Sequence, residues 1–523
     1  MRKLGYILLV MCALECSSCN DFLDVKPVGQ MIPTEVTQFE NLLNNTTTLD
    51  YFMFDNNRSC FYAYMGDNIQ ISENHAKYQF TATYPNLDLL AGYTFYTPVM
   101  DPQNTPFAWS SGIYKAAGYF NNVVDGVSGI DTNSEYAKGV IAQAKAGRAW
   151  IYLNAALIYG PMYVPGTTND TKVIPCRTSG DPIAANGLLC TTDELLAQVK
   201  EDLDYACENC PASTVNPCRA DRACAYALRA EYHMFTRNWE NMLSDCQKAW
   251  ELALANRKNV DEMIYNFADF YFEATTEINP DPGVSPEVYM TLKGPDLLFD
   301  QTSNRENLLY RNAPYQSSST RYYPSDDWAS IFDKEKDLRW TKFVLKDHGY
   351  NTTVGDVVYD DGIQLVYYRD ELSITEGVTY PLLLLMKAEA AARTNNLSAA
   401  LADLNLLRKY RYKGPDSDLA GGTSLSQDQL LNEILTERRR EQPLVSFQRT
   451  LDLKRYAQDA GKPWSKDIIV HKIGEKTYSK SINDAYYQSL PIDNAILQYN
   501  PQWGIAENNS LFEPYNACLL YTS

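Results

Sequence analysis

The segment PLLLLMKAEAAARTNNLSAALADLNLLRKYR, residues 381–411, has the pattern of two consecutive helices joined by a short turn. In its second half, leucines recur at the three- to four-residue spacing of a single helix face: Leu397, Leu401, Leu404 and Leu407. Its first half is rich in alanine, which lets neighbouring helices pack closely. The segment therefore predicts a helical pair and a mostly α-helical fold.

Similar patterns lie on both sides of this segment. GVIAQAKAGRAWIYLNAALIYG carries a stripe of small and apolar residues, Ala146, Ala149, Leu153 and Ala156, and FAWSSGIYKAAGYFNNVVDGV supplies a partner helix before it. TTDELLAQVKEDLDYAC has Thr191 or Thr192 as a cap and acidic residues in its first turn. Helical pairs are therefore predicted over about 107–160, 191–256 and 379–441, loosely similar to tetratricopeptide repeats.

Two long regions have a different composition. Residues of about 50–105 and 260–375 are rich in Tyr, Pro, Gly, Asp and Ser and show few helical stripes. Long irregular segments within a compact domain are usually functional. We therefore expect these two regions to carry a ligand site.

The N-terminus, MRKLGYILLVMCALECSSCNDFLD, reads as a secretory signal. Arg2 and Lys3 precede an apolar run that is too short to span a bilayer, which needs about 20 residues. Small residues stand just before Cys19, whereas acidic Glu15 precedes Cys16. We predict a signal peptide over 1–18, a lipidated Cys19, and a tether or first segment over 19–45. A C-x-x-C redox or metal pair is the alternative, but no βαβ pattern follows it.

Composition limits the partners and cofactors. The chain has 523 residues and a formal charge of −19, which argues against binding to nucleic acid or anionic lipid. It has 38 tyrosines, a residue type common in binding sites, and 4 scattered histidines without metal spacing. No cofactor and no metal are predicted.

Four cysteines crowd into YACENCPASTVNPCRADRAC: Cys207, Cys210, Cys218 and Cys224. One or two disulfides at a helical corner, or free thiols, are the favoured interpretations. Four cysteines could also close a zinc site, which is the less favoured reading.

Five stretches, taken together and in order, resemble the SusD/RagB family of nutrient-binding lipoproteins. They are SSCNDFLDVKPVGQ, KAGRAWIYLNAALIYGPMYVP, the opening segment 381–411, ILTERRREQPLVSFQRTLDLKRY and LPIDNAILQYNPQW. One departure is local: LVSFQR replaces the family's usual Phe-Glu-Gly ahead of Arg449.

The resemblance implies a fold, a location and a function. The fold would be a mostly α-helical SusD-like domain over 46–517, with four degenerate tetratricopeptide-like helix pairs, long irregular loops and minor β-structure. The protein would be a non-catalytic lipoprotein on the extracellular face of the outer membrane. It would bind oligo- or polysaccharide and deliver it to a SusC-like TonB-dependent transporter. A branch of the family handles peptides instead.

The charged residues of the fourth stretch are interpreted as structural. We expect a network of bidentate arginine–carboxylate pairs that holds helices together. Its members are Glu437, Arg438, Arg439, Glu441, Arg449, Asp452 and Arg455.

Aromatic residues in the two loop regions are the candidate ligand contacts, because sugar rings stack on exposed aromatic faces. The candidates are Tyr84, Tyr93, Tyr96, Tyr315 and Tyr322, with Asp67 and Asn68 as polar partners. Trp109 and Trp328 are predicted to be core residues.

Three other functions compete with glycan capture. A peptide-binding protein would have the same fold, but fewer aromatic rings would stack on its ligand. The repeats alone suggest a scaffold for protein–protein interactions. A glycoside hydrolase would need two carboxylates about 5–10 Å apart, and no motif marks such a pair.

At the C-terminus, CLLYTS over 518–523 resembles a translated sequencing adapter and is left out of the predicted domain.

Overall fold

The structure is a computed structural model of the chain. It describes residues 33–44, 60–80, 87–96, 108–181, 187–277, 287–295, 303–312, 321–367, 375–415 and 417–507.

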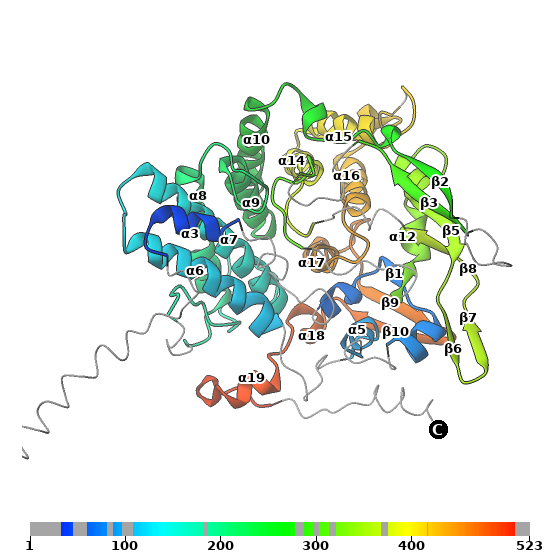
Figure 1. The fold of residues 1–523 in the computed structure, drawn as a ribbon, viewed down its shortest axis with the longest axis horizontal. Coiled ribbons are helices and arrows are strands. Elements are labelled where there is room, and N and C mark those ends of the chain that lie inside the picture. Colours follow the sequence, from blue (N-terminus) through cyan, green and yellow to red (C-terminus); the bar gives the residue numbers. More distant parts are fainter. Residues whose placement is uncertain are drawn as a thin grey trace, which may run out of the picture.

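The first helical pair consists of α6 (Tyr114–Ser128) and α7 (Glu135–Tyr159), which pack against each other (Figure 1). Ser134 caps α7 by accepting a hydrogen bond from a backbone N–H of the first turn. Most of α7 is buried. Gly147 allows the close contact between the helices, since a Cβ there would lie 2.2 Å from the Phe120 ring.

The next three helices are α8 (Thr192–Asn209), α9 (Arg222–Phe235) and α10 (Trp239–Ala255). Thr191, one of the two predicted caps, forms a complete capping box with Glu194. Helix α8 packs on α7 and on α9, and α9 packs on α10. The predicted helices over this part of the chain are confirmed.

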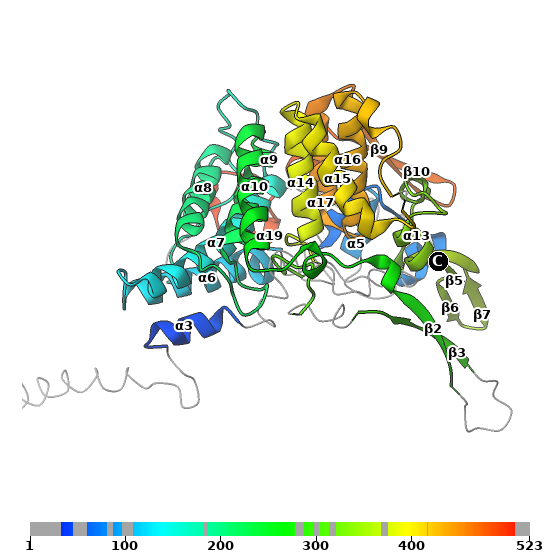
Figure 2. The same cartoon turned by 90° about the horizontal axis from the view of Figure 1, so that it is seen from above.

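The late helices are α14 (Tyr380–Arg393), α15 (Leu397–Arg411), α16 (Gln427–Glu441) and α17 (Phe447–Tyr456). Leu404 and Leu407 of the predicted stripe are buried, whereas Leu397 and Leu401 are half-buried at its edge. Helix α14 contacts α10, α15 and α16, so it joins the two helical groups that stand side by side in Figure 2.

The remaining described α-helices are short. They are α3 (Val36–Leu42), α5 (Leu87–Tyr93), α12 (Asp326–Ser330), α13 (Leu338–Phe343), α18 (Ala485–Gln488) and α19 (Asn494–Gln498).

The described strands form two-stranded antiparallel sheets, not one large sheet. The pairs are β1 (Ile69–Gln70) with β4 (Tyr323–Pro324), β2 (Tyr271–Glu277) with β3 (Glu287–Lys293), β5 (Val344–His348) with β8 (Ile363–Tyr367), β6 (Asn351–Val354) with β7 (Val357–Asp360), and β9 (Ile468–Ile473) with β10 (Lys476–Ser481). The region 260–375 was expected to be irregular, and its described part instead contains most of these hairpins. The mostly α-helical fold with minor β-structure is confirmed.

The predicted charge network is confirmed, and it extends beyond the predicted residues. Arg339 is fully buried and donates to Glu441 at 2.6 Å and also to Glu437. Arg411 donates to Glu441 at 2.8 Å, so two helices and the α13 segment meet at this carboxylate. Because each buried charge has a close partner, the network fixes α15 against α16 without leaving an uncompensated ion.

The other predicted members pair in the same way. Arg438 and Arg455 both donate to Asp452, at 2.9 and 2.7 Å. Arg455 also binds Glu389 through two nitrogens, at 2.6 and 3.0 Å. These contacts tie α16 and α17 to α14.

Candidate functional site

The structure describes three of the five tyrosines predicted to face a ligand. Tyr84 and Tyr315 lie outside the described residues, so their roles stay predictions. Tyr96 is half-buried against the core. Tyr93 and Tyr322 are 1% and 0% exposed, so both rings lie inside the protein, and their contact with a ligand stays a prediction.

Tyr93 is buried because residues distant in the sequence cover it. It ends α5 and does not lie in a loop, and its ring stacks on His471 of β9 with centroids 4.2 Å apart. Its hydroxyl donates to the backbone carbonyl of Lys472 at 3.1 Å and accepts from the N–H of Ile71 at 3.3 Å. Both the ring and the hydroxyl of Tyr93 are therefore in contact with other residues of the protein.

Tyr322 packs edge-to-face on Tyr64, with ring centroids 6.2 Å apart. Trp109 and Trp328 are 4% and 1% exposed, which confirms that both are core residues.

Asp67 and Asn68 are buried in the interior of the protein. Arg449 binds Asp67 through two nitrogens at 2.8 and 2.9 Å, and Lys466 donates to it at 2.6 Å. Burial alone would raise the pKa of Asp67, but these cations and Arg439 hold that pKa well below its usual range. Asn68 accepts from Arg439 at 2.8 Å. Both side chains are therefore bound by other residues of the protein, and their contact with a ligand stays a prediction.

All four clustered cysteines are buried, and none of them forms a disulfide with another described residue, so the disulfide alternative is not what the structure shows. Burial raises the pKa of Cys207 to about 12 and those of Cys210 and Cys224 well above their usual range. Thiols that keep their protons are poor nucleophiles and poor metal ligands. Within the described residues, no group of three or more His, Cys, Asp or Glu side chains is placed to hold a metal.

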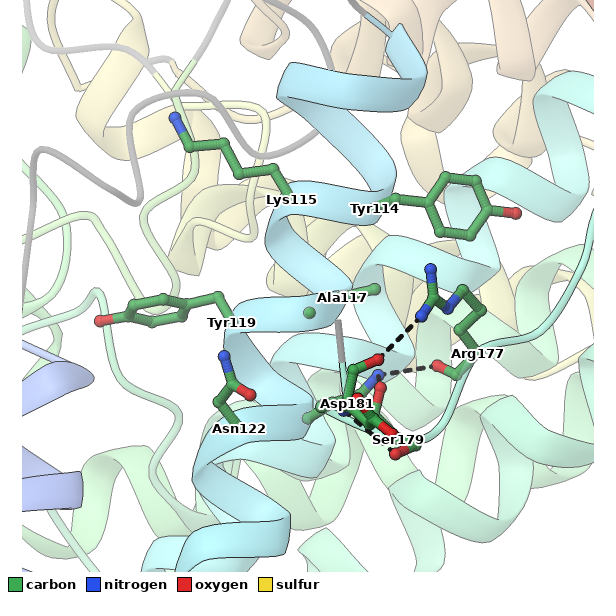
Figure 3. Close-up of a pocket in the computed structure, with 11 residues that line it drawn as sticks. Tyr114, Lys115, Ala117, Tyr119, Asn122, Arg177, Ser179 and Asp181 are labelled. Atoms are coloured by element: carbon green, nitrogen blue, oxygen red, sulfur yellow. Dashed lines mark hydrogen bonds between the residues drawn. The ribbon is translucent and has the colours of Figure 1, made fainter. Parts of the chain in front are cut away.

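A pocket opens on α6, where the segment after α7 returns alongside it (Figure 3). Its volume is about 360 Å³, within the range of small-molecule sites. It is lined by Tyr114, Lys115, Ala117, Gly118, Tyr119, Asn121, Asn122, Arg177, Ser179, Gly180 and Asp181.

One face of α6 forms the floor of this pocket. Lys115, Tyr119 and Asn122 recur at the spacing that places residues on the same side of a helix. Gly118 lies among them, and a Cβ at this position would meet no atom within 4 Å. A glycine in a helix interior costs about 0.5–1 kcal/mol relative to alanine, and here it leaves the floor open.

Buried hydrogen bonds hold the opposite wall in place. The hydroxyl of Tyr152 donates to the carbonyl of Arg177 at 2.7 Å and accepts from its N–H at 2.9 Å. Asn121 also donates to that carbonyl, at 2.9 Å, and accepts from Arg148 at 2.8 Å. Arg148 is in turn paired with Asp202 through two bonds of 2.7 Å. The Arg148–Asp202 ion pair therefore positions Asn121, and Asn121 in turn holds the backbone of Arg177 in the wall.

Two further contacts fix the wall at its ends. Tyr114 donates to the carbonyl of Pro175 at 2.8 Å, and the N–H of Gly180 donates to Asp125 at 2.7 Å. Gly180 passes so close to α6 that a Cβ there would lie 2.3 Å from the Asn122 side chain. Hydrogen bonds and close packing against α6 therefore hold the pocket wall in a defined position.

The sequence prediction missed this pocket, although one signal was present. In YKAAGYFNN, residues 114–122, an aromatic, a cation, a glycine and an amide fall on one helix face. The same residues also fit a helix that packs against α7, and this is the role that the sequence prediction gives them. The contribution of Arg177, from 55 residues beyond Asn122, has no local signal.

Two family models match the chain. One, described as the SusD family, matches residues 383–507, and one described as "Starch-binding associating with outer membrane" matches residues 21–233. The chain belongs to the SusD/RagB family. The resemblance seen in the sequence is therefore confirmed.

A curated relative and solved structures agree with this family. A SusD-like protein of Formosa agariphila is 23% identical over 304 residues, which are 56% of this chain and 52% of the relative. The chain thus matches about half the length of that relative.

Among solved structures, a SusD superfamily protein of Bacteroides thetaiotaomicron has a TM-score of 0.63 at 15% identity, covering 89% of this chain and 98% of that one. A SusD-like carbohydrate-binding protein of Bacteroides vulgatus has a TM-score of 0.55 at 17% identity, covering 92% and 100%. At these identities the likeness shows the fold.

Within the described residues of this SusD/RagB-family chain, no helix is long and apolar enough to cross a membrane. Cys19, the predicted lipidation site, lies outside the described residues.

Proposed function

We propose that this protein binds oligo- or polysaccharide at the cell surface and delivers it to a SusC-like TonB-dependent transporter. The observation that carries the proposal is the α6 pocket in a chain of this family. Its lining combines tyrosine rings with amide, cationic and carboxylate side chains. Rings of this kind stack on the C–H faces of sugars, and the polar groups match sugar hydroxyls. The carbohydrate-binding description of a protein with this fold supports the same reading.

The proposed role is capture without catalysis. Hydrolysis of a glycosidic bond uses two carboxyl groups about 5–10 Å apart. Asp181 is the one carboxylate among the described residues that line the pocket. This lining fits a sugar-binding site better than a hydrolase site.

A binding screen tests the proposal. The purified protein is applied to immobilised glycans and to a peptide library, and soluble glycans are assayed for release of reducing ends. We expect binding to glycans without such release. Binding to peptides alone would favour the peptide-handling branch of the family, and released reducing ends would indicate an enzyme.

Membrane attachment through Cys19 is part of the proposal. Supporting it are the short apolar run before Cys19 and the outer-membrane description of the family model that matches residues 21–233. Cells grown with an alkyne-tagged fatty acid should label the wild-type protein and a Cys16→Ala variant, but not Cys19→Ala. Labelling of Cys19→Ala would contradict this assignment.

The transporter partner is tested separately. Detergent extracts of outer membranes should yield a TonB-dependent barrel protein together with the tagged lipoprotein. A lipoprotein that is recovered alone after chemical cross-linking in intact cells would contradict the partnership.

A further inference from the structure

Helix α3 lies between the proposed lipid anchor and the helical pairs. It is the first described element after Cys19. Figure 2 shows it at the outer edge of the first helical pair, and it contacts both α6 and α7. The chain that joins the anchor to the helical pairs therefore passes through α3.

The sequence of α3 does little to stabilise a helix by itself. The helix has seven residues, whereas isolated helices shorter than about 12–15 residues are marginal in water. Val36 and Thr37, in its first turn, are β-branched and disfavour a helix slightly. Its N-cap, Glu35, makes no capping hydrogen bond through its side chain, and the first turn holds no acidic residue. We therefore attribute the helix to its contacts with α6 and α7.

One of these contacts is an aromatic ring that fits against a glycine. Phe39 is 9% exposed, and its ring occupies the space beside Gly126 of α6. A Cβ at position 126 would overlap that ring. Leu43, at the C-terminal end of α3, is buried as well. The docking of α3 on α6 therefore depends on the missing side chain of one glycine.

The second contact is a charged cluster at the surface. Glu40 accepts a hydrogen bond from Tyr136 of α7 at 2.5 Å and another from Arg219. Arg219 also donates to Gln143 of α7 at 2.7 Å and to Asn44 at 3.1 Å, so it bridges α3 and α7. The side chain of Glu40 is 25% exposed. Water can therefore compete for this cluster when α3 moves.

We propose that residues 33–44, which contain α3, form a releasable strap that sets how far the domain extends from its lipid anchor. A docked helix rises about 1.5 Å per residue, whereas extended chain spans up to about 3.3–3.6 Å per residue. Because α3 has little stability of its own, undocking unfolds it and lengthens the tether. A longer tether lets the domain move away from the membrane without leaving it. This inference rests on the anchoring at Cys19 in the proposed function.

Two alanine substitutions in the same helix test the docking. Gly126→Ala places a Cβ where the Phe39 ring lies, whereas Gly118→Ala adds the same Cβ to α6 where no atom lies within 4 Å. Hydrogen–deuterium exchange of the purified full-length protein is the measurement. We expect exchange over residues 33–44 to be at least about tenfold faster in Gly126→Ala than in Gly118→Ala or the wild type, with α14–α17 unchanged.

A second variant releases the strap without touching α6. Glu40→Ala removes the charged partner of Arg219 at a partly exposed position. It should speed exchange over residues 33–44 about three- to tenfold, again with α14–α17 unchanged. Exchange at the wild-type rate in this variant and in Gly126→Ala would overturn the inference.

The reach of the domain is measured by energy transfer. A fluorophore is placed at Lys248, on an exposed part of α10, and acceptor lipids are placed in the vesicle that holds the anchored protein. We expect less energy transfer in Gly126→Ala than in the wild type or in Gly118→Ala. Faster exchange with unchanged energy transfer would overturn the inference, because α3 would then open without changing the reach. Anchoring itself is tested by the fatty-acid labelling of Cys19, so a failure of the strap and a failure of the anchor are distinguishable.

Discussion

The charge network between α13 and α17 and the pocket on α6 use the same residue types in opposite ways. In the network, arginines such as Arg339 are fully buried, and carboxylates such as Glu441 accept from two of them. In the pocket, the arginine, lysine and tyrosine side chains line an open volume beside a glycine floor.

This difference shows how a structural site can be told from a binding site within one chain. Buried ion pairs hold a fold when each charge is matched by the protein itself. A binding site instead keeps polar groups and free space for a ligand to use. Amino-acid composition does not distinguish a structural charge cluster from a binding site. The burial of the side chains and the hydrogen-bond partners of their polar atoms do.

The largest expected effect comes from breaking the network. Arg339→Ala leaves Glu437, Glu441 and Asp337 without their shared cation and should lower the free energy of unfolding by about 3–5 kcal/mol. Urea denaturation measures this change. Lys248→Ala breaks an exposed pair with Glu251 and should cost less than about 1 kcal/mol. Equal effects of the two variants would mean that the network is not what holds the late helices together.

A smaller effect concerns a carboxyl at the edge of the network. Glu231 is buried with one oxygen unpartnered among the described atoms, and burial raises its pKa to about 7. Because the folded state holds this proton more tightly than the unfolded state, stability should fall as pH rises from about 4.5 to about 7.

Glu231→Gln should remove about 2–3 kcal/mol of that fall. Urea denaturation at several pH values across this window measures it. Glu376, which faces Glu231 and whose pKa is raised to about 8, remains and keeps part of the slope. A variant with the same slope as the wild type would show that Glu231 is ionised in the fold.

The smallest effect compares two helical glycines. Gly118→Ala adds a Cβ into open space and should stabilise the protein by about 0.5–1 kcal/mol. Gly147→Ala places a Cβ against the Phe120 ring and should destabilise it by about 1–3 kcal/mol. Thermal unfolding of both variants gives the sign. A destabilised Gly118→Ala would mean that the pocket floor is not open.

The helices were predictable from the sequence because their signals are local. The buried part of α15 follows the leucine spacing of residues 397–407, and α8 begins at a threonine that the sequence marks as a cap. The arginine network was also predictable in part, since arginines and carboxylates lie close together over residues 437–455 and can form bidentate pairs.

The site was less predictable because its parts are brought together by tertiary contacts. In the sequence, Tyr93 has the surroundings of an exposed loop aromatic. In the fold, His471, which lies 378 residues later, stacks on its ring. Arg177 reaches the pocket because Tyr152 and Asn121 bind its backbone, and neither contact has a sequence pattern. An interior glycine on a helix face that also carries aromatic and polar residues was the one local sign.

Calorimetric titration of Gly118→Trp most directly tests the claim that the α6 pocket is the glycan site. The ligand is a glycan that binds the wild type in the screen, and Ser128→Trp, at the exposed end of the same helix, is the matched control. We expect Gly118→Trp to unfold like the wild type yet to lose at least about tenfold in affinity, a loss of about 1.4 kcal/mol, while Ser128→Trp binds normally. Undiminished binding by a folded Gly118→Trp variant would contradict the claim.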